Sequence, residues 1–255
     1  MTGKNFAPLG VLLLGLPALA LAQWFDIRTP GTPRLPDGKP NLAAPAPRMP
    51  DGRIDISGIW QPASRMFINI TDAKSGELPM QPWAAALYKH RRDTESIDDP
   101  TGHCIPGGVP RSDAVPYPFK IVKSQKMMII LYEAVHGYRQ IFTDGRQLPK
   151  DPNPTWQGYS IGHWDGPDFV AETSGFNDNG WIDNDGHPAT DAEHVTERFE
   201  RKDFGHMDIV VTVDDPKAYT KPWTVTEPFK LLPDTELLEY VCNENNKDLK
   251  HLVGK

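Results

Sequence analysis

The segment from Gly158 to Gly162 has the spacing G-x-S-x-G, the pattern that carries the nucleophilic serine of many hydrolases. In those enzymes a strand precedes the serine and a helix follows it, so that a strained turn presents the hydroxyl at a helix N-terminus. Here the next residues, His163 to Gly166, predict a strand that runs into a hairpin. We therefore expect Ser160 to be a strand residue between two glycines rather than a nucleophile.

Acid–base side chains recur within or beside the segments that have strand-like patterns. A carboxylate or imidazole that faces a desolvated interior has a shifted pKa and can move a proton on a bound carbonyl or alcohol. Such groups would suit a lyase or isomerase, although alternation along a strand sends half of them to water and inward groups can satisfy one another. The catalytic candidates are Glu133, Arg139, His163, Glu172, Arg198 and His206, with Tyr240 as a further polar group.

The most polar stretch of the chain runs from Asn177 to Arg198. Part of it resembles a calcium loop, but the first ligand position falls on Trp181 and no glutamate follows at the required spacing. Its histidines could instead hold a transition metal, yet they lack the H-x-x-x-H spacing of a helical site. The favoured interpretation is a solvated acidic loop between two strands. The metal-ligand candidates are Asp183, Asp185, His187 and His194.

Aromatic residues are frequent in the predicted strands and turns. They could form an apolar pocket for an aromatic or amphipathic molecule, or they could fill the core of a barrel that holds no ligand. The sequence alone leaves both possibilities open. The candidates for ligand contact are Trp60, Tyr138, Tyr159, Trp164, Trp181 and Tyr240.

Short strands are the elements that must position these groups. A first strand is predicted to begin at Gly58. A short helix is predicted over Pro82 to Lys89, with proline in its first turn. Asp144-Gly145 and Asp165-Gly166 are dipeptides typical of hairpin turns. Alternation of apolar and polar residues predicts further strands over 119–124, 127–135, 138–143, 158–164, 168–173, 194–202, 207–213, 223–231 and 236–242.

About ten short strands with hardly any helix between them cannot form a βαβ sheet. They predict an all-β fold, an antiparallel meander closed into a barrel with one or two short helices. A β-sandwich is the alternative. The high content of turn residues, 26 prolines and 21 glycines in 255 residues, makes a mostly helical protein improbable.

The charge of the chain excludes one class of partner. There are 27 Lys and Arg residues against 34 Asp and Glu residues, which gives a formal net charge of -7. Without a basic excess, no counterions would be displaced from DNA or RNA, so a nucleic acid is not an expected partner. The hydrophobic content of 38% permits one sizeable core.

The N-terminal segment, residues 1–22, has the features of a secretory signal peptide. An early cation, Lys4, precedes an apolar run that ends in the small-x-small pattern Ala20 to Ala22, and the run is too short to span a membrane. We expect cleavage after Ala22, no membrane span afterwards, and a periplasmic or extracellular location.

The mature chain is expected to begin with a proline-rich segment, residues 23–53, that is either an extended tether or a strap lying on the domain. Two Pro-Asp-Gly turns repeat in it, at Pro36 and at Pro50. The folded domain is predicted over residues 54–255.

Two cysteines, Cys104 and Cys242, complete the framework. In an oxidising compartment the simplest expectation is one disulfide between them. No cofactor is predicted, because the chain lacks a dinucleotide-binding G-x-G-x-x-G after a strand, a P-loop and a C-x-x-C-H haem motif. A metal ion, or haem held noncovalently by a single histidine, leaves no spacing signature and stays open.

The opening of the predicted domain resembles known proteins. Gly58-Ile59-Trp60 resembles the Gly-x-Trp motif of the first strand in lipocalin-like (calycin) barrels. Longer blocks, at Pro50 to Trp60, Asp144 to Arg146, Gly162 to Gly166 and Thr196 to Phe199, resemble a family of secreted bacterial proteins of unknown function. The resemblance implies a secreted bacterial origin and transfers no catalytic residues.

Three functions follow from these predictions. The preferred one is binding of a small apolar or amphipathic molecule in the mouth of the barrel. The first alternative is a lyase or isomerase that uses His and carboxylate groups in the same cavity, and the second is an envelope protein without a ligand. Oligomeric state and ligand identity are not determined by the sequence.

Overall fold

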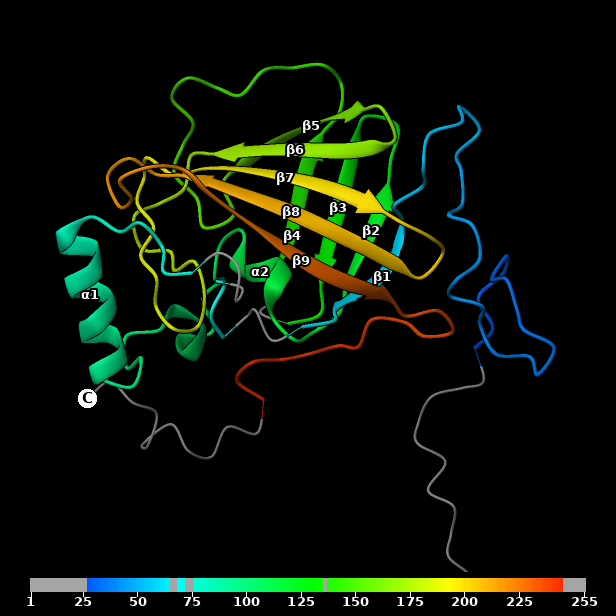
Figure 1. The fold of residues 1–255 in the computed structure, drawn as a ribbon, viewed down its shortest axis with the longest axis horizontal. Coiled ribbons are helices and arrows are strands. Elements are labelled where there is room, and N and C mark those ends of the chain that lie inside the picture. The colour runs from blue at the N-terminus through cyan, green and yellow to red at the C-terminus, as the bar shows by residue number, and fades with distance from the viewer. Residues whose placement is uncertain (1–26, 65–67, 72–75, 135–136, 245–255) are drawn as a thin grey trace, which may run out of the picture.

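The computed structural model describes residues 27–64, 68–71, 76–134 and 137–244, and the predicted signal peptide lies outside these ranges. Within them the chain forms a closed barrel of nine strands, in which β1 pairs with both β2 and β9 (Figure 1). The strands are β1 Gly58–Pro62, β2 Phe119–Lys123, β3 Met127–Tyr132, β4 Tyr138–Phe142, β5 Tyr159–Asp165, β6 Asp168–Ser174, β7 His194–Arg201, β8 His206–Asp214 and β9 Trp223–Leu231. The predicted all-β barrel is confirmed.

One pair of strands departs from the predicted antiparallel meander. Strands β4 and β5 are parallel, with Ile141 opposite Ser160, whereas the other neighbours in the barrel are antiparallel. A tight hairpin at Asp144-Gly145 would have made this pair antiparallel. Instead the connection continues through three prolines, at positions 149, 152 and 154, before β5 begins. Proline cannot donate to a strand ladder, so the chain returns to the other end of the barrel before it pairs again.

The prediction of a strand over 236–242 is wrong, since these residues form no strand in the structure. A closed barrel has no free edge at which another strand could pair. The segment instead follows the outside of the molecule, where the Leu238 amide donates to the Glu133 carboxylate at 2.9 Å.

Alternation along the strands places the apolar core inside the barrel. In β8 the residues Met207, Ile209, Val211 and Val213 are all buried, and the residues between them are half-buried, as the period of two predicts. Strand β7 alternates in the same way. Aromatic rings from different strands meet inside, as when Phe119 of β2 packs edge-on against Phe229 of β9, on the other side of β1, with centroids 5.4 Å apart. The barrel is therefore filled with side chains.

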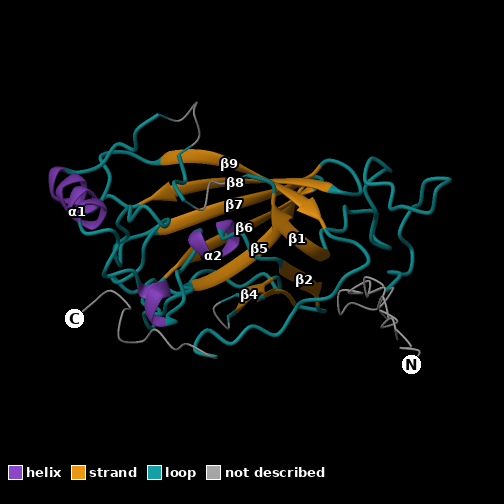
Figure 2. Cartoon of the chain, turned by 90° about the horizontal axis from the view of Figure 1, so that it is seen from below, coloured by secondary structure: helices purple, strands orange, loops and turns teal. Residues whose placement is uncertain are grey.

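Three short helical elements lie at one end of the barrel. They are α1 (Pro82–Asp93), a 3-10 turn (Pro100–His103) and α2 (Arg111–Ala114), and we call this the helix end (Figures 1 and 2). Helix α1 begins at the predicted proline and extends four residues past the predicted Lys89. Its last turn contains Arg91 and Arg92, whose positive charges suit the negative end of the helix dipole.

The proline-rich segment closes the opposite end, which we call the strap end (Figure 1). Residues 27–53, the strap, bind the turn between β7 and β8, where the amides of Phe204 and Gly205 donate to the carbonyls of Ala44 (2.7 Å) and Leu42 (2.8 Å). An ion pair between Arg34 and Asp234 ties the strap to the chain that leaves β9.

The two Pro-Asp-Gly repeats form the same turn. Gly38 and Gly52 adopt positive φ angles of 84° and 86°, a conformation that glycine accepts readily. Each turn is closed by the arginine four residues before its glycine, since Arg34 donates to the Gly38 carbonyl and Arg48 donates to the Gly52 carbonyl. The repeated sequence therefore encodes a repeated local structure.

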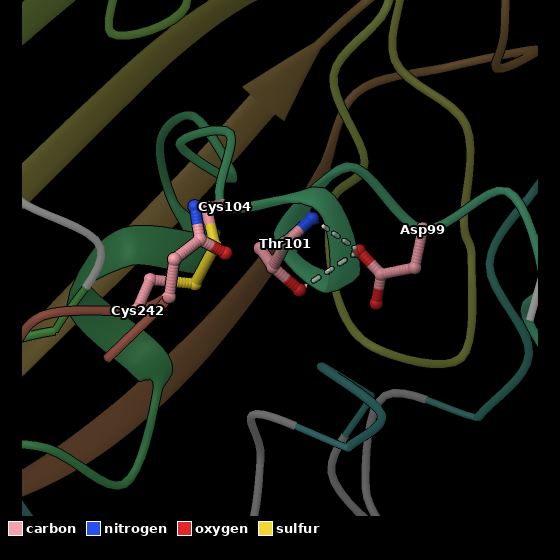
Figure 3. The surroundings of a disulfide bond; sticks show 5 residues. Asp99, Thr101, Cys104 and Cys242 are labelled. Carbon is pink, nitrogen blue, oxygen red and sulfur yellow. Dashed lines mark hydrogen bonds between the residues drawn. A yellow bond between two sulfur atoms is a disulfide. The ribbon is translucent and has the colours of Figure 1, made fainter. Parts of the chain in front are cut away.

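The predicted disulfide between Cys104 and Cys242 is confirmed (Figure 3). It joins the residue that ends the 3-10 turn to the C-terminal segment, and the nearby Asp99 carboxylate accepts hydrogen bonds from the amide and hydroxyl of Thr101 (Figure 3). Among the described helices, none has the length and apolar character that crossing a membrane requires.

Candidate functional site

A buried polar network occupies the barrel interior around Arg139, which is 2% exposed. Its guanidinium donates to Ser160 Oγ (3.0 Å), to Thr173 Oγ1 (2.7 Å), to the Glu197 carboxylate and to Asp113 Oδ2 (3.2 Å). These partners come from β5, β6, β7 and α2. One inward arginine thus connects three strands and the short helix that lies against the interior.

Two buried carboxyl groups in this interior, Asp113 and Glu227, are shifted toward their neutral forms. Burial raises the pKa of Asp113 well above its ordinary value, and the negative charge of Glu197 adds to this effect. Burial likewise raises the pKa of Glu227, an inward residue of β9. With these two groups favoured as neutral acids, the charge of Arg139 is balanced chiefly by Glu197.

This network is part of the packed core and not an open active site. The cavity beside it, which Tyr132 and Arg111 help to line, has a volume of about 10 Å³, room for about one water molecule. A substrate could reach Arg139 only if the barrel opened.

The remaining acid–base candidates do not converge with Arg139. Glu172 lies 3.7 Å from His194 on the outer wall, Arg198 pairs with Asp165 and Asp168, and His206 contacts Asp203. His163 is exposed, Glu133 binds the Leu238 amide, and Tyr240 lies against Tyr117 outside the barrel. Within the described residues, no hydrogen bond or ion pair joins any two of the six catalytic candidates. Their catalytic role stays a prediction.

The metal-ligand candidates fall into two separate groups. Asp183 and His187 are both buried and contact each other, with 2.6 Å between Oδ2 and Nδ1, and Asp183 also accepts the amides of Gly186 and Ile70. Asp185 pairs with Arg92 of α1, whereas His194 lies beside Glu172. In the part of the chain that the structure describes, no cluster of three or more His, Cys, Asp or Glu side chains is placed to hold a metal ion.

The aromatic candidates are also dispersed. Trp60 is fully buried and donates to the Ile56 carbonyl, and Trp181 is buried beneath the guanidinium of Arg91 at 4.2 Å. Tyr138 is 64% exposed, whereas Tyr159 stacks on Phe142 and Trp164 is half-buried against Phe169. They do not line one common cavity in the barrel.

A cavity of about 440 Å³ lies instead at the strap end, between the strap and the ends of β1, β2, β7 and β9. We call it the strap pocket. Its volume falls within the range of about 300–1,000 Å³ that is usual for small-molecule sites. Apolar side chains form one part of the lining, and charged side chains form another. The apolar residues include Ile59, Phe204, Leu231 and Leu232, and the charged residues are Arg28, Asp55, Lys120, Arg201 and Glu236.

Arg201 is the unusual residue of the strap pocket. It is 8% exposed, and its guanidinium donates to the backbone carbonyls of Asp55, Ser57, Asp203 and Phe204. No carboxylate of the described residues lies within ion-pair distance of it. Desolvation lowers the pKa of Arg201 to about 10, because burial disfavours its charged form.

Lys120 contributes a second cation that has no partner of opposite charge. It is half-buried in β2, and among the described residues nothing forms a hydrogen bond or ion pair with its ammonium group. The strap pocket therefore combines an apolar wall with two cations that no carboxylate neutralises by direct contact.

Arg201, Lys120 and Phe204 are not among the site residues predicted from the sequence. One signal was available, because Arg201 falls in phase with the inward Val195 and Phe199 of β7. An arginine at an inward position, at the last residue of a strand, predicts a charged side chain at the rim of a barrel.

Comparison of the chain with models of protein families found no match, and comparison with curated proteins found no similar sequence.

Proposed function

We propose that this is an exported protein that binds a small amphipathic anion in the strap pocket. The observation that carries the proposal is Arg201, a buried guanidinium that is satisfied only by backbone carbonyls and lies next to an apolar wall. Export is supported by the disulfide, which is typical of oxidising compartments, together with the predicted signal peptide.

The charges of the strap pocket favour an anion over a cation. Its lining carries three cations against two carboxylates, Asp55 and Glu236, an excess of one positive charge. Asp55 is already engaged, since it accepts the Ser57 amide at 2.9 Å. A carboxylate or sulfonate near Arg201 would also offset the desolvation of the guanidinium, because a charge-assisted hydrogen bond is stronger in a water-poor site.

The apolar part of the lining suits a short alkyl chain or a ring. Two aromatic rings lie beside the Arg201 guanidinium. Its central carbon is 5.5 Å from the ring centre of Phe204 and 4.9 Å from that of Trp60. Trp60 is fully buried, so it would support Arg201 from behind and would not touch the ligand directly. Leu232 is half-buried and can contribute apolar contact area without carrying the barrel core.

Titration calorimetry with two probes of equal chain length tests the proposal. Dodecanoate has an anionic head group and dodecyltrimethylammonium has a cationic one, and both are used below their micellar concentrations on the mature chain. We expect saturable binding of dodecanoate at one site and no saturable binding of the cation. Equal binding of both probes, or of neither, would exclude an anion-selective strap pocket.

Matched lysine variants place the binding site. Lys120→Gln removes the unpaired cation of the strap pocket, whereas Lys221→Gln removes an exposed lysine at the opposite end of the barrel. Loss of one partly screened charge contact is worth about 1 kcal/mol, so we expect Lys120→Gln to weaken dodecanoate binding about fivefold. The Lys221→Gln variant should bind like the original chain, and Leu232→Ala should weaken dodecanoate binding without weakening acetate binding.

A further inference from the structure

A second cavity at the strap end has a different chemistry. It has a volume of about 250 Å³ and lies where the second Pro-Asp-Gly turn of the strap meets the β2–β3 turn and the ends of β4 and β5. We call it the turn pocket. The side chains that line it include Arg53, Lys123, Ser124, Thr143, His163 and Trp164. It shares no lining residue with the strap pocket.

The turn pocket is basic although the whole chain has a net charge of -7. Among the residues that the structure describes, its lining contains Arg53, Lys123 and His163 and not one carboxylate. The acids beside it are engaged elsewhere, since Asp51 pairs with Arg53, and Asp144 pairs with Arg146. Asp165, next to His163 in the β5–β6 hairpin, pairs with Arg198.

Lys123 is the cation that these acids leave without a carboxylate partner. Its ammonium group lies 2.8 Å from the sulfur of Met49, a weak acceptor, and no ion pair joins it to a described residue. An ammonium group can donate three hydrogen bonds, so Lys123 keeps donors for a ligand. The hydroxyls of Ser124 and Thr143 add donors from the β2–β3 turn and from the end of β4.

Trp164 supplies the one large aromatic surface of the turn pocket. It is half-buried, its ring makes a T-shaped contact with Phe169, and the guanidinium of Arg53 lies over it, 5.4 Å from its ring centre. A planar group could stack on this ring beside the guanidinium, an arrangement that gains both apolar contact and cation–π attraction.

We infer that the turn pocket binds a small phosphate monoester that carries a planar ring. The phosphoryl oxygens would accept hydrogen bonds from Lys123 and from the Ser124 and Thr143 hydroxyls, and the ring would stack on Trp164. A phosphoryl group suits this set of donors better than a carboxylate does, because it offers three terminal oxygens to donors from separate elements. Binding here involves no covalent step.

Calorimetric titration of the mature chain with phenyl phosphate, in a buffer free of phosphate, tests the inference. The matched variants are Lys123→Gln, in the turn pocket, and Lys126→Gln, an exposed lysine on the same turn that does not line it. We expect Lys123→Gln to weaken phenyl phosphate binding by about tenfold, the size of one charge-assisted hydrogen bond. Lys126→Gln and the strap-pocket variant Lys120→Gln should leave it unchanged.

Inorganic phosphate separates the contribution of the ring from that of the anion. Phenyl phosphate should bind more tightly than inorganic phosphate to the original chain, and Trp164→Leu should remove that preference while inorganic phosphate binding persists. The comparison on the original chain stands even if Trp164→Leu does not fold. Absence of saturable phenyl phosphate binding, equal weakening by Lys126→Gln, or equal affinity for the two probes would overturn the inference.

Discussion

The two arginines Arg139 and Arg198 offer a direct test of the difference between the inside and the outside of the barrel. Each pairs with two carboxylates, but Arg139 and its partner Glu197 have side chains that are 1% and 0% exposed, whereas the Arg198 side chain is 35% exposed. Replacing Arg139 by methionine keeps much of its volume and removes its charge. The Glu197 carboxylate would then be buried without a counter-ion.

The expected cost follows from the number of charges left unpaired. Because burial favours the neutral form of Asp113, one net negative charge, that of Glu197, loses its partner in Arg139→Met. Removing one member of a buried pair costs about 3–5 kcal/mol. The Arg198→Met change should cost only a small fraction of that, because exposed ion pairs are screened by solvent.

Urea denaturation followed by tryptophan fluorescence measures both variants. We expect a large loss in the free energy of unfolding for Arg139→Met at pH 7. A double variant, Arg139→Met with Glu197→Gln, should recover part of the loss. Similar losses for Arg139→Met and Arg198→Met would refute the view that Arg139 is the counter-ion of the core.

Three further changes probe other features of the structure. Burial raises the pKa of Glu227, so the folded chain holds a proton that the unfolded chain releases above about pH 4.5, and stability should fall with rising pH by up to about 1.4 kcal/mol per pH unit from this group. Glu227→Gln should remove that slope in urea titrations from pH 4 to 8. Parallel curves of stability against pH for the variant and the original chain would contradict the assignment. The double change Cys104→Ser and Cys242→Ser should lower the free energy of unfolding by at most about 5 kcal/mol, the chain-entropy value for a separation of 138 residues, and an unchanged urea midpoint would show that the bridge adds no stability. Gly158→Ala should destabilise more than Gly145→Ala in thermal denaturation, because both have positive φ but only at Gly158 would a Cβ meet atoms within 3.0 Å; a difference of about 1–3 kcal/mol is expected, and equal losses would mean that φ alone decides the cost.

The barrel was predictable because the sequence of each strand alternates between side chains that face the core and side chains that face outward. In β8 the alternation of Met207, Ile209, Val211 and Val213 with more polar residues specifies the buried face without knowledge of any partner strand. The Asp165-Gly166 dipeptide likewise specifies the hairpin between β5 and β6, whose ends pair through Asp165 and Asp168.

The prediction failed where pairing depends on the whole sheet. Residues 236–242 have the composition of a strand, yet β1 and β9 already pair with each other and leave no edge for it. The parallel pairing of β4 with β5 is set by a connection that must travel the length of the barrel. Neither property is visible in a window of ten residues.

The strap pocket was beyond prediction for the same reason. It exists because the carbonyls of Leu42 and Ala44 bind the β7–β8 turn, a contact between segments far apart in the sequence. Strand periodicity could place Arg201 at an inward position, but only the docked strap forms the other wall of the cavity. Of the aromatic residues chosen from the sequence, Trp60 and Trp181 are buried, whereas Tyr138 and Tyr240 are exposed. Tyr138 is exposed because alternation along a strand sends half of its side chains outward.

The distribution of paired and unpaired charge favours ligand binding at the strap end over binding inside the barrel. Inside, the charge of Arg139 is matched by Glu197, and Ser160, Thr173 and Asp113 accept its remaining hydrogen bonds, so an anion that entered would have to displace an existing partner. At the strap end, no described carboxylate forms an ion pair with Arg201 or Lys120. An anion that binds there as proposed would therefore gain interactions without breaking an ion pair. The proposed ligand sites therefore lie at the rim of this barrel, where the strap supplies a wall, and not in the filled interior.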